Sequence, residues 1–215
     1  MVNNESINWD NLQYLGCVRM KIKIAIVGPE LSKWPQNFEG EVKKEILSII
    51  RSKCPVYTDG TRITKDRFCY DDIILVSGHC PKGGVDLWAE EIADELGIKK
   101  EIYPAEVNQW GDEISHQIEI GIGYKPEAPS KVRLKGYKSR NIQIAEACDV
   151  LCCIVPHTYP PKGFDITNLS SFTIKDARSF HCIHCKKLGH PTNGGCFTLK
   201  QARKLNKIVQ LRIIQ

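Results

Sequence analysis

The chain lacks any apolar run that approaches the roughly 20 residues needed to cross a bilayer. Its opening, MVNNESINWDNLQYLG, also lacks the basic-then-apolar order of a secretory signal. We therefore expect a soluble, cytoplasmic protein with no membrane partner. No internal repeat or low-complexity segment is found, and 215 residues with 42% hydrophobic side chains suffice for one globular domain with a substantial core.

Cysteine, by contrast, is plentiful, with ten residues in the chain. Disulfides are disfavoured in the cytosol, so clustered cysteines are better read as metal ligands and scattered ones as buried apolar residues. The scattered set comprises Cys17, Cys54, Cys69, Cys148, Cys152 and Cys153.

Apolar periodicity predicts strands that alternate with helices. The β-branched run KIKIAIVG, closed by glycine and proline, is typical of a buried parallel strand. We predict strands over 21–28, 71–78, 98–105, 149–156 and 207–214, and helices over 38–51, 87–97, 139–147 and 196–206. This order indicates an α/β fold, a Rossmann-like parallel sheet with helices on both faces.

Within the chain we expect an N-terminal extension over 1–19 and one domain over 20–215. Glycines and prolines break the periodicity of 106–137, which reads as an insertion. A second insertion covers 157–196 and carries a small zinc-binding segment.

A glycine-rich turn joins the second strand to its helix in ILVSGHCPKGGVDLWAEEIADELG. Gly78, Gly83 and Gly84 let the backbone approach a ligand, and the amides of a helix start favour an anion. The alternative is that these glycines serve only a tight turn.

The order of several segments resembles the SLOG superfamily, in particular its YspA/YpsA-related branch near the DprA and LOG-type members. The resemblance lies in KIAIVG, LVSGHCPKGGVDLWAEEIADELGI, EIYPA, SRNIQIAEACDVL and GGCFTLKQARKLNKIVQL, which together cover roughly half of the chain.

This resemblance implies a site for a nucleotide or a nucleotide-derived molecule. The ligand-binding residues that it suggests are Gly28, Ser77, Gly78, Gly83, Gly84, Asp86, Arg140, Asn141, Gly194, Gly195 and Thr198. A guanidinium at Arg140 suits phosphate, and an amide at Asn141 suits a hydroxyl or a base edge. Asp86 and Asn141 are alternatively helix caps, and Arg140 is alternatively a surface cation.

The chain also departs from that family. His79 stands where glycine is usual, and Lys200 and Gln201 occupy positions that are acidic in the LOG phosphoribohydrolases. Glycosidic cleavage needs a carboxylate, so nucleoside-monophosphate hydrolysis should be weak unless Asp86 or Glu90 supplies a catalytic acid.

The run CIHCKKLGHPTNGGC offers four close metal ligands, Cys182, Cys185, His190 and Cys196. Thiolate and imidazole ligands at this spacing suit tetrahedral Zn²⁺. The segment resembles a retroviral CCHC zinc knuckle with a last spacing one residue longer. Alternatives are a cluster of free thiols, or His181 or His184 as a substitute ligand.

A knuckle that reads nucleobases exposes a stacking ring, whereas Ile183 and Leu188 stand at the comparable positions here. We therefore expect structural zinc. The leading hypothesis is a nucleotide-binding domain; a nucleotide N-glycosidase and a single-stranded nucleic-acid binder are the alternatives. The sequence leaves self-association open.

Overall fold

The computed structural model describes residues 21–54, 70–115, 131–157, 181–187 and 189–215. The expected N-terminal extension over 1–19 lies outside these residues, as do Cys17, Cys69 and Leu188. Among the described residues, none of the helices combines the length and the apolar character that crossing a membrane takes.

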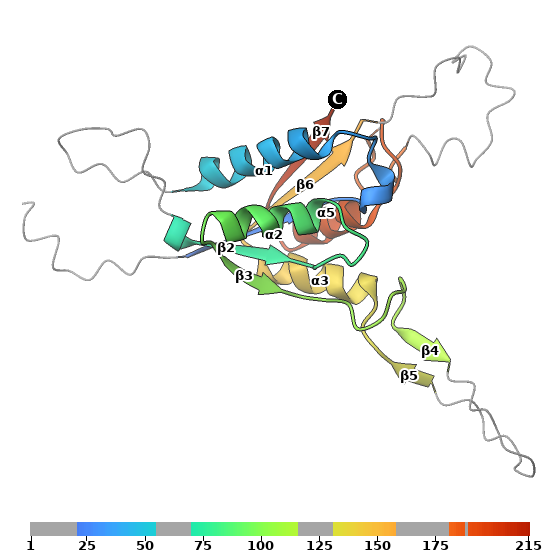
Figure 1. Cartoon of the computed structure of the whole chain (residues 1–215). Coiled ribbons are helices and arrows are strands. Elements are labelled where there is room, and N and C mark those ends of the chain that lie inside the picture. The colour runs from blue at the N-terminus through green and yellow to red at the C-terminus, as the bar shows by residue number, and fades with distance from the viewer. Residues whose placement is uncertain (1–20, 55–69, 116–130, 158–180, 188) are drawn as a thin grey trace, which may run out of the picture.

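Five parallel strands form the central sheet, in the order β3-β2-β1-β6-β7 (Figure 1). The strands are β1 (Ile22–Val27), β2 (Ile73–Ser77), β3 (Lys99–Ile102), β6 (Val150–Pro156) and β7 (Ile208–Ile214). Each of the five predicted strands is therefore present, with ends that differ from the prediction by at most three residues.

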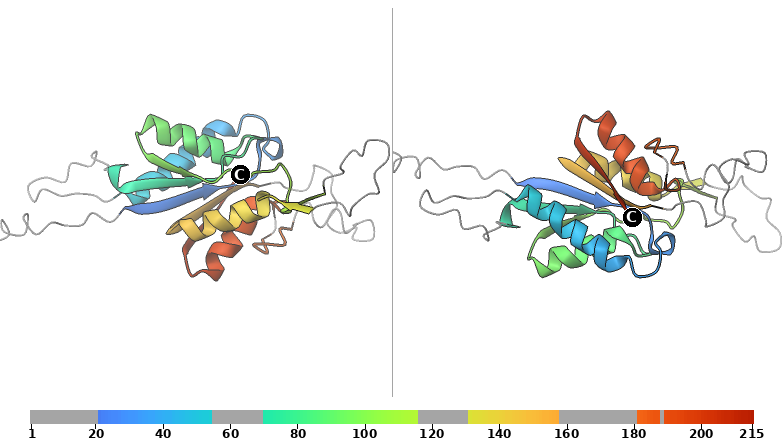
Figure 2. Two further views of the ribbon diagram at one scale, coloured as in Figure 1. Left: turned by 90° about the horizontal axis from the view of Figure 1, so that it is seen from below. Right: turned by 90° about the horizontal axis from the view of Figure 1, so that it is seen from above.

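Helices cover both faces of the sheet, as Figure 2 shows. One face packs against α1 (Glu39–Lys53) and α2 (Val85–Glu95), and the other against α3 (Tyr137–Ala147) and α5 (Gly194–Lys204). Alternation along β1 supplies both cores, because Ile24 and Ile26 face the first pair of helices while Ala25 and Val27 face the second. The predicted Rossmann-like α/β fold is confirmed.

Four scattered cysteines lie in these cores, as predicted. Cys54 ends α1, Cys148 follows α3, and Cys152 and Cys153 lie on opposite faces of β6. Each is buried as a small apolar side chain.

The segment predicted as an insertion over 106–137 contains two short antiparallel strands, β4 (Glu113–Ser115) and β5 (Lys131–Arg133). Two short 3-10 helices, η2 (Leu31–Lys33) and η3 (Tyr70–Asp72), complete the described elements.

The strand order reverses at β1. The chain runs outward from β1 through β2 to β3, and then returns to the other side of β1 with β6 and β7. In open parallel sheets, ligands bind beyond the carboxyl ends of the strands at such a reversal. The end of β1 is therefore where a ligand site is expected.

Gly28 directly follows β1 and brings three elements into close contact. A Cβ atom at Gly28 would lie 2.4 Å from Cγ2 of Val85 and 2.5 Å from the carbonyl oxygen of Ile154. A Cβ at Gly195 would lie 2.8 Å from Cα of Gly28. Only glycine lets the starts of α2 and α5 approach the end of β1 this closely.

We predict that Gly28→Ala lowers the free energy of unfolding by about 1–3 kcal/mol, because the backbone oxygen of Ile154 cannot move away cheaply. Gly40→Ala is the matched control, since a Cβ there meets nothing within 4 Å and alanine favours a helix by up to about 1 kcal/mol. Urea unfolding of both variants measures the effects. Equal stability of the two variants would contradict the steric explanation.

Candidate functional site

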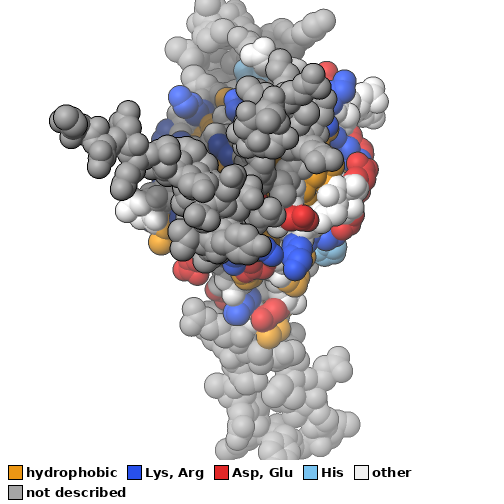
Figure 3. Space-filling view, turned by 90° about the vertical axis from the view of Figure 1, so that its left-hand side faces the viewer, with side chains coloured by type: hydrophobic (Ala, Val, Ile, Leu, Met, Phe, Trp, Pro, Cys, Tyr) orange, Lys and Arg blue, Asp and Glu red, His pale blue; other side chains and the backbone are white. Residues whose placement is uncertain are grey.

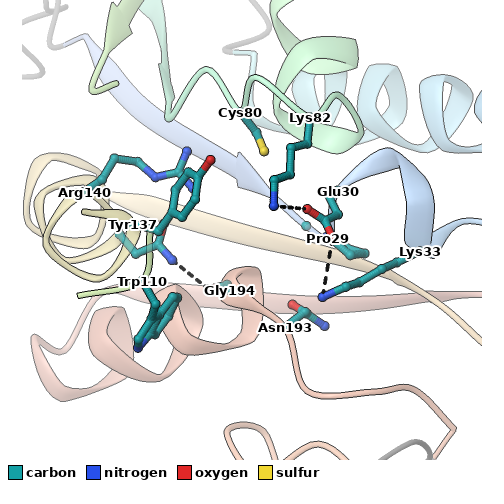
Figure 4. Close-up of a pocket in the computed structure, with 12 residues that line it drawn as sticks. Pro29, Glu30, Lys33, Cys80, Lys82, Trp110, Tyr137, Arg140, Asn193 and Gly194 are labelled. Atoms are coloured by element: carbon teal, nitrogen blue, oxygen red, sulfur yellow. Dashed lines mark hydrogen bonds and ion pairs between the residues drawn. The ribbon is translucent and has the colours of Figure 1, made fainter. Parts of the chain in front are cut away.

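A cavity of about 210 Å³ lies at the reversal point of the sheet. Its walls come from the segment after β1, the loop between β2 and α2, the loop before β4, and the first turns of α3 and α5 (Figure 4). The residues that line it are Gly28, Pro29, Glu30, Lys33, Cys80, Lys82, Trp110, Tyr137, Arg140, Asn141, Asn193 and Gly194.

One end of the cavity is ionic. Oε2 of Glu30 lies 3.4 Å from Nζ of Lys82, and Oε1 of Glu30 lies 3.9 Å from Nζ of Lys33. Figure 4 shows the two ammonium groups on either side of this carboxylate. Asp86 neutralises the charge of Arg140, and Glu30 neutralises one of the two lysines. This end of the cavity therefore carries a net charge of +1.

The other end is aromatic. The Trp110 side chain is 45% exposed, and its ring meets Phe197 edge-on at 5.2 Å between centroids. Backbone hydrogen bonds from Tyr137 to Gln109 and from Lys138 to Trp110 hold this loop against the start of α3. An exposed ring held in this way can stack on a planar ligand.

Arg140 reaches from α3 across the end of β2. Its Nη1 donates to the carbonyl of Gly78 at 2.8 Å and lies 3.3 Å from Oδ2 of Asp86, while its guanidinium lies 5.2 Å from the centre of the Tyr137 ring. A Cβ at Gly78 would lie 2.1 Å from Nη1, so glycine makes room for the guanidinium. Nε is buried with no hydrogen-bond partner among the described residues. With 7% of its surface exposed, Arg140 is no surface cation, and that alternative is wrong.

Asp86 is buried in the first turn of α2. Burial raises the pKa of its carboxyl to about 6, because desolvation outweighs the opposite effect of Arg140. The N-cap of α2 is Gly84, and the Asp86 carboxyl pairs instead with Arg140 and with the backbone of Gly28, so the cap interpretation is wrong. Asn141 also is no cap, since it lies in the second turn of α3 and donates to the carbonyl of Gly194.

Glu90 joins two residues at the end of β2. Its Oε1 accepts from the Ser77 hydroxyl at 2.5 Å, and its Oε2 lies 2.8 Å from Nδ1 of His79. His79 has a φ of 48°, in the left-handed region that glycine favours. Glu90 and Ser77 are buried, and neither they nor Asp86 belong to the lining of the cavity.

The structure thus brings only some of the predicted ligand residues to the cavity: Gly28, Arg140, Asn141 and Gly194. The others have roles within the protein. Gly84 has a φ of 94°, and a Cβ there would lie 2.5 Å from the carbonyl oxygen of Pro29. Thr198 donates to Gly194, Gly195 contacts Gly28, and Gly83 faces Leu31. Lys200 is exposed on α5 and also lies outside the lining.

Sequence reasoning missed much of the lining. Cys80 and Lys82 lie inside the glycine-rich turn between β2 and α2, although only the glycines of that turn were predicted as ligand residues. Burial raises the pKa of the Cys80 thiol. Glu30 and Lys33 lie in the segment after the first strand, a position that could have identified them. Trp110 gave no usable signal, because its place depends on how the loop before β4 folds back on α3.

The second candidate centre is a buried Cys₃His group. The ligand atoms of Cys182, Cys185, His190 and Cys196 all lie within 4.8 Å of one another, so this group could hold a metal ion. His181 and His184 are not members, and the His184 ring instead meets Phe197 edge-on.

Hydrogen bonds prepare the group for a cation. Nδ1 of His190 donates to the carbonyl of Pro191 at 3.0 Å, which leaves Nε2, 3.2 Å from Sγ of Cys185, as the acceptor. A hydrogen bond with Cys196 lowers the pKa of Cys182 below the usual value of a thiol. Bonds with Cys153 and Cys182 raise the pKa of Cys196. One thiolate is therefore favoured here, in the form that binds metals.

The two centres share one helical turn. Asn193, the N-cap of α5, accepts from the amide of Cys196, so the candidate metal ligand Cys196 and the cavity residues Asn193 and Gly194 are held together. An interaction that fixes Cys196 therefore also fixes Asn193 and Gly194 in the wall of the cavity.

On the face shown in Figure 3, lysines and arginines lie among aspartates and glutamates over the described surface. This mixture differs from the continuous basic stripe that is typical of nucleic-acid-binding proteins.

Comparison of the chain with protein-family models, curated proteins and solved structures finds no match.

We predict that Asp86→Asn changes stability in a pH-dependent way. The folded carboxyl has a pKa of about 6 against 3.8 for the free group, so the folded state binds the proton more tightly. The advantage of wild type over the variant is therefore largest below pH 4 and falls by about 3 kcal/mol as the pH rises through 6. Urea unfolding of both proteins at pH 4 and pH 7 measures the difference. A difference that is constant, or that grows with pH, would contradict the raised pKa.

Proposed function

We propose that the protein binds a nucleotide or a nucleotide-derived ligand in the cavity at the end of β1. The observation that carries this proposal is the division of one cavity into an aromatic end, at Trp110 and Tyr137, and a cationic end, at Lys33 and Lys82. A nucleotide has the same division between its base and its phosphate.

At the aromatic end, the half-exposed Trp110 ring offers a stacking surface that is not specific for one base. The Asn141 amide, which lines the cavity and donates to the carbonyl of Gly194, would contact a base edge or a ribose hydroxyl. At the cationic end, the lysines supply charge. The first turns of α3 and α5, which line the cavity as a whole, add the partial positive charge of two helix N-termini.

The size of the cavity favours a small ligand. Its volume of about 210 Å³ lies below the 300–1,000 Å³ typical of pockets for drug-sized molecules. A single nucleotide therefore fits the proposal better than an oligonucleotide.

Membership of the SLOG superfamily remains part of this proposal, supported by the motif order and by the Rossmann-like sheet. The N-glycosidase is the weaker alternative. Asp86 is paired with Arg140, Glu90 is bonded to Ser77 and His79, and neither carboxylate lines the cavity. Chromatographic detection of free base from nucleoside monophosphates would support that alternative.

We predict that Trp110→Ala weakens the binding of a nucleoside monophosphate by about 1–3 kcal/mol, as loss of one stacking contact does. Trp110→Phe should retain most of the affinity, because the phenyl ring still stacks. Leu205→Ala is the control, since Leu205 is similarly exposed but lies at the other end of α5. Calorimetric titration compares the four proteins. Unchanged affinity in Trp110→Ala would overturn the stacking proposal.

For the Cys₃His group we propose structural Zn²⁺. Three thiolates and one imidazole would supply all four ligands that Zn²⁺ takes in structural sites, which would leave no position for water or substrate. The ion would fix the start of α5, and with it the wall of the cavity formed by Asn193 and Gly194.

Protein purified without added zinc should contain about one equivalent per chain. Cys185→Ser should lose the metal and also bind nucleotide more weakly, because the start of α5 is no longer fixed. Cys148→Ser, which alters a buried thiol outside the group, should keep the metal. Elemental analysis and calorimetry on the same samples measure both effects. A folded wild-type protein free of metal would contradict the zinc assignment.

A further inference from the structure

We infer that Glu30 is an intramolecular counter-ion that occupies the place of a ligand's terminal phosphate, so that the cavity selects phosphomonoesters over phosphodiesters. This inference rests on the proposed nucleotide site and adds a selectivity that the site alone does not imply.

The ion pairs of Glu30 are loose compared with others in the same protein. Its distances to Lys82 and Lys33 are 3.4 and 3.9 Å. By contrast, Lys43 lies 2.6 Å from Glu39 and 2.7 Å from Glu91, and Lys23 lies 2.7 Å from Glu101. Charged N–H···O contacts are normally about 2.7–2.9 Å long. The two cavity lysines are therefore incompletely paired.

The backbone around Glu30 explains why its ion pairs are long. Glu30 caps η2 and Lys33 ends it, and the Lys33 amide donates to the Glu30 carbonyl at 3.0 Å, so both residues are fixed on one turn. Lys82 approaches from the loop on the opposite side (Figure 4). Oε1 faces Lys33 and the Ser32 hydroxyl, while Oε2 faces Lys82. A single carboxylate is thus divided between two cations.

A phosphate could satisfy both lysines at once only by displacing Glu30. A phosphodiester carries one negative charge, the same as the carboxylate that it would replace, so the exchange gains little. A phosphomonoester carries about 1.5 to 2 negative charges at pH 7 and three acceptor oxygens. Without Glu30, Lys33 and Lys82 match that charge. Only the monoester gains enough from the two lysines to compete.

The test measures the affinity of wild type and Glu30→Gln for three probes: adenosine, its 5′-monophosphate and the methyl ester of that monophosphate. Glutamine keeps the shape of the side chain and an acceptor for Ser32. In the variant, the phosphate no longer has to break the two weak ion pairs that Glu30 makes with Lys33 and Lys82. The variant should therefore bind the monophosphate about three- to tenfold more tightly. Adenosine affinity should not change.

In wild type, the methyl ester should bind no more tightly than adenosine, whereas in Glu30→Gln it should bind more tightly than adenosine. Glu39→Gln is the matched control, because Glu39 also pairs with a lysine but does not line the cavity. Of the three probes, Lys82→Gln should weaken the binding of the monophosphate only.

The outcomes separate the two proposals. If wild type binds none of the probes, nor the corresponding guanine, cytosine and uracil compounds, the proposed function fails. If wild type binds the monophosphate but Glu30→Gln binds it no more tightly, or if wild type binds the methyl ester as tightly as the monophosphate, the nucleotide site stands and the role of Glu30 is overturned. Thermal unfolding of each variant confirms that it is folded.

Discussion

The contact between Gly28 and Gly195 is the constraint on which the rest of the structure depends. It brings the end of β1, the start of α5 and, through Val85, the start of α2 to one point at the reversal of the strand order. Any side chain at Gly28 would separate these elements, because its Cβ would meet the Ile154 carbonyl and the Val85 side chain. The cavity opens beside this contact, with Gly28 and Gly194 in its wall. The glycines therefore shape the site mainly by allowing protein to pack against protein.

The Cys₃His group supports the same point from the other side. Cys196 follows Gly195 directly, and Asn193 accepts from its amide. A metal ion bound to the Cys₃His group would hold the first turn of α5 at Cys196, while the contact with Gly28 at the end of β1 holds the same turn at Gly195. Coupling between two binding sites is reciprocal. A ligand that orders Gly194 would then favour metal retention to the same degree that the metal favours the ligand.

The sequence was a good guide to the strands, the helices and the Cys₃His group, because these depend on local periodicity and on ligand spacing. It was a poorer guide to the cavity. The glycines of the β2–α2 turn proved to accommodate Arg140 and the Pro29 carbonyl, contacts made across long stretches of chain. Trp110, Glu30 and Lys33 carry the chemistry proposed here, yet their convergence depends on loops, whose paths no periodicity reveals.

The buried pair of Asp86 and Arg140 fits this view of a binding site. Such a pair is weak evidence for stability, since desolvation offsets much of the attraction. Its effect here is positional. Asp86 belongs to the helical layer on one face of the sheet and Arg140 to the layer on the other, and they meet over Gly78 at the end of β2. The guanidinium in turn packs against the Tyr137 ring, at the aromatic end of the cavity. Charges paired in this way hold the walls of the cavity in place, and Asp86 itself does not line the cavity.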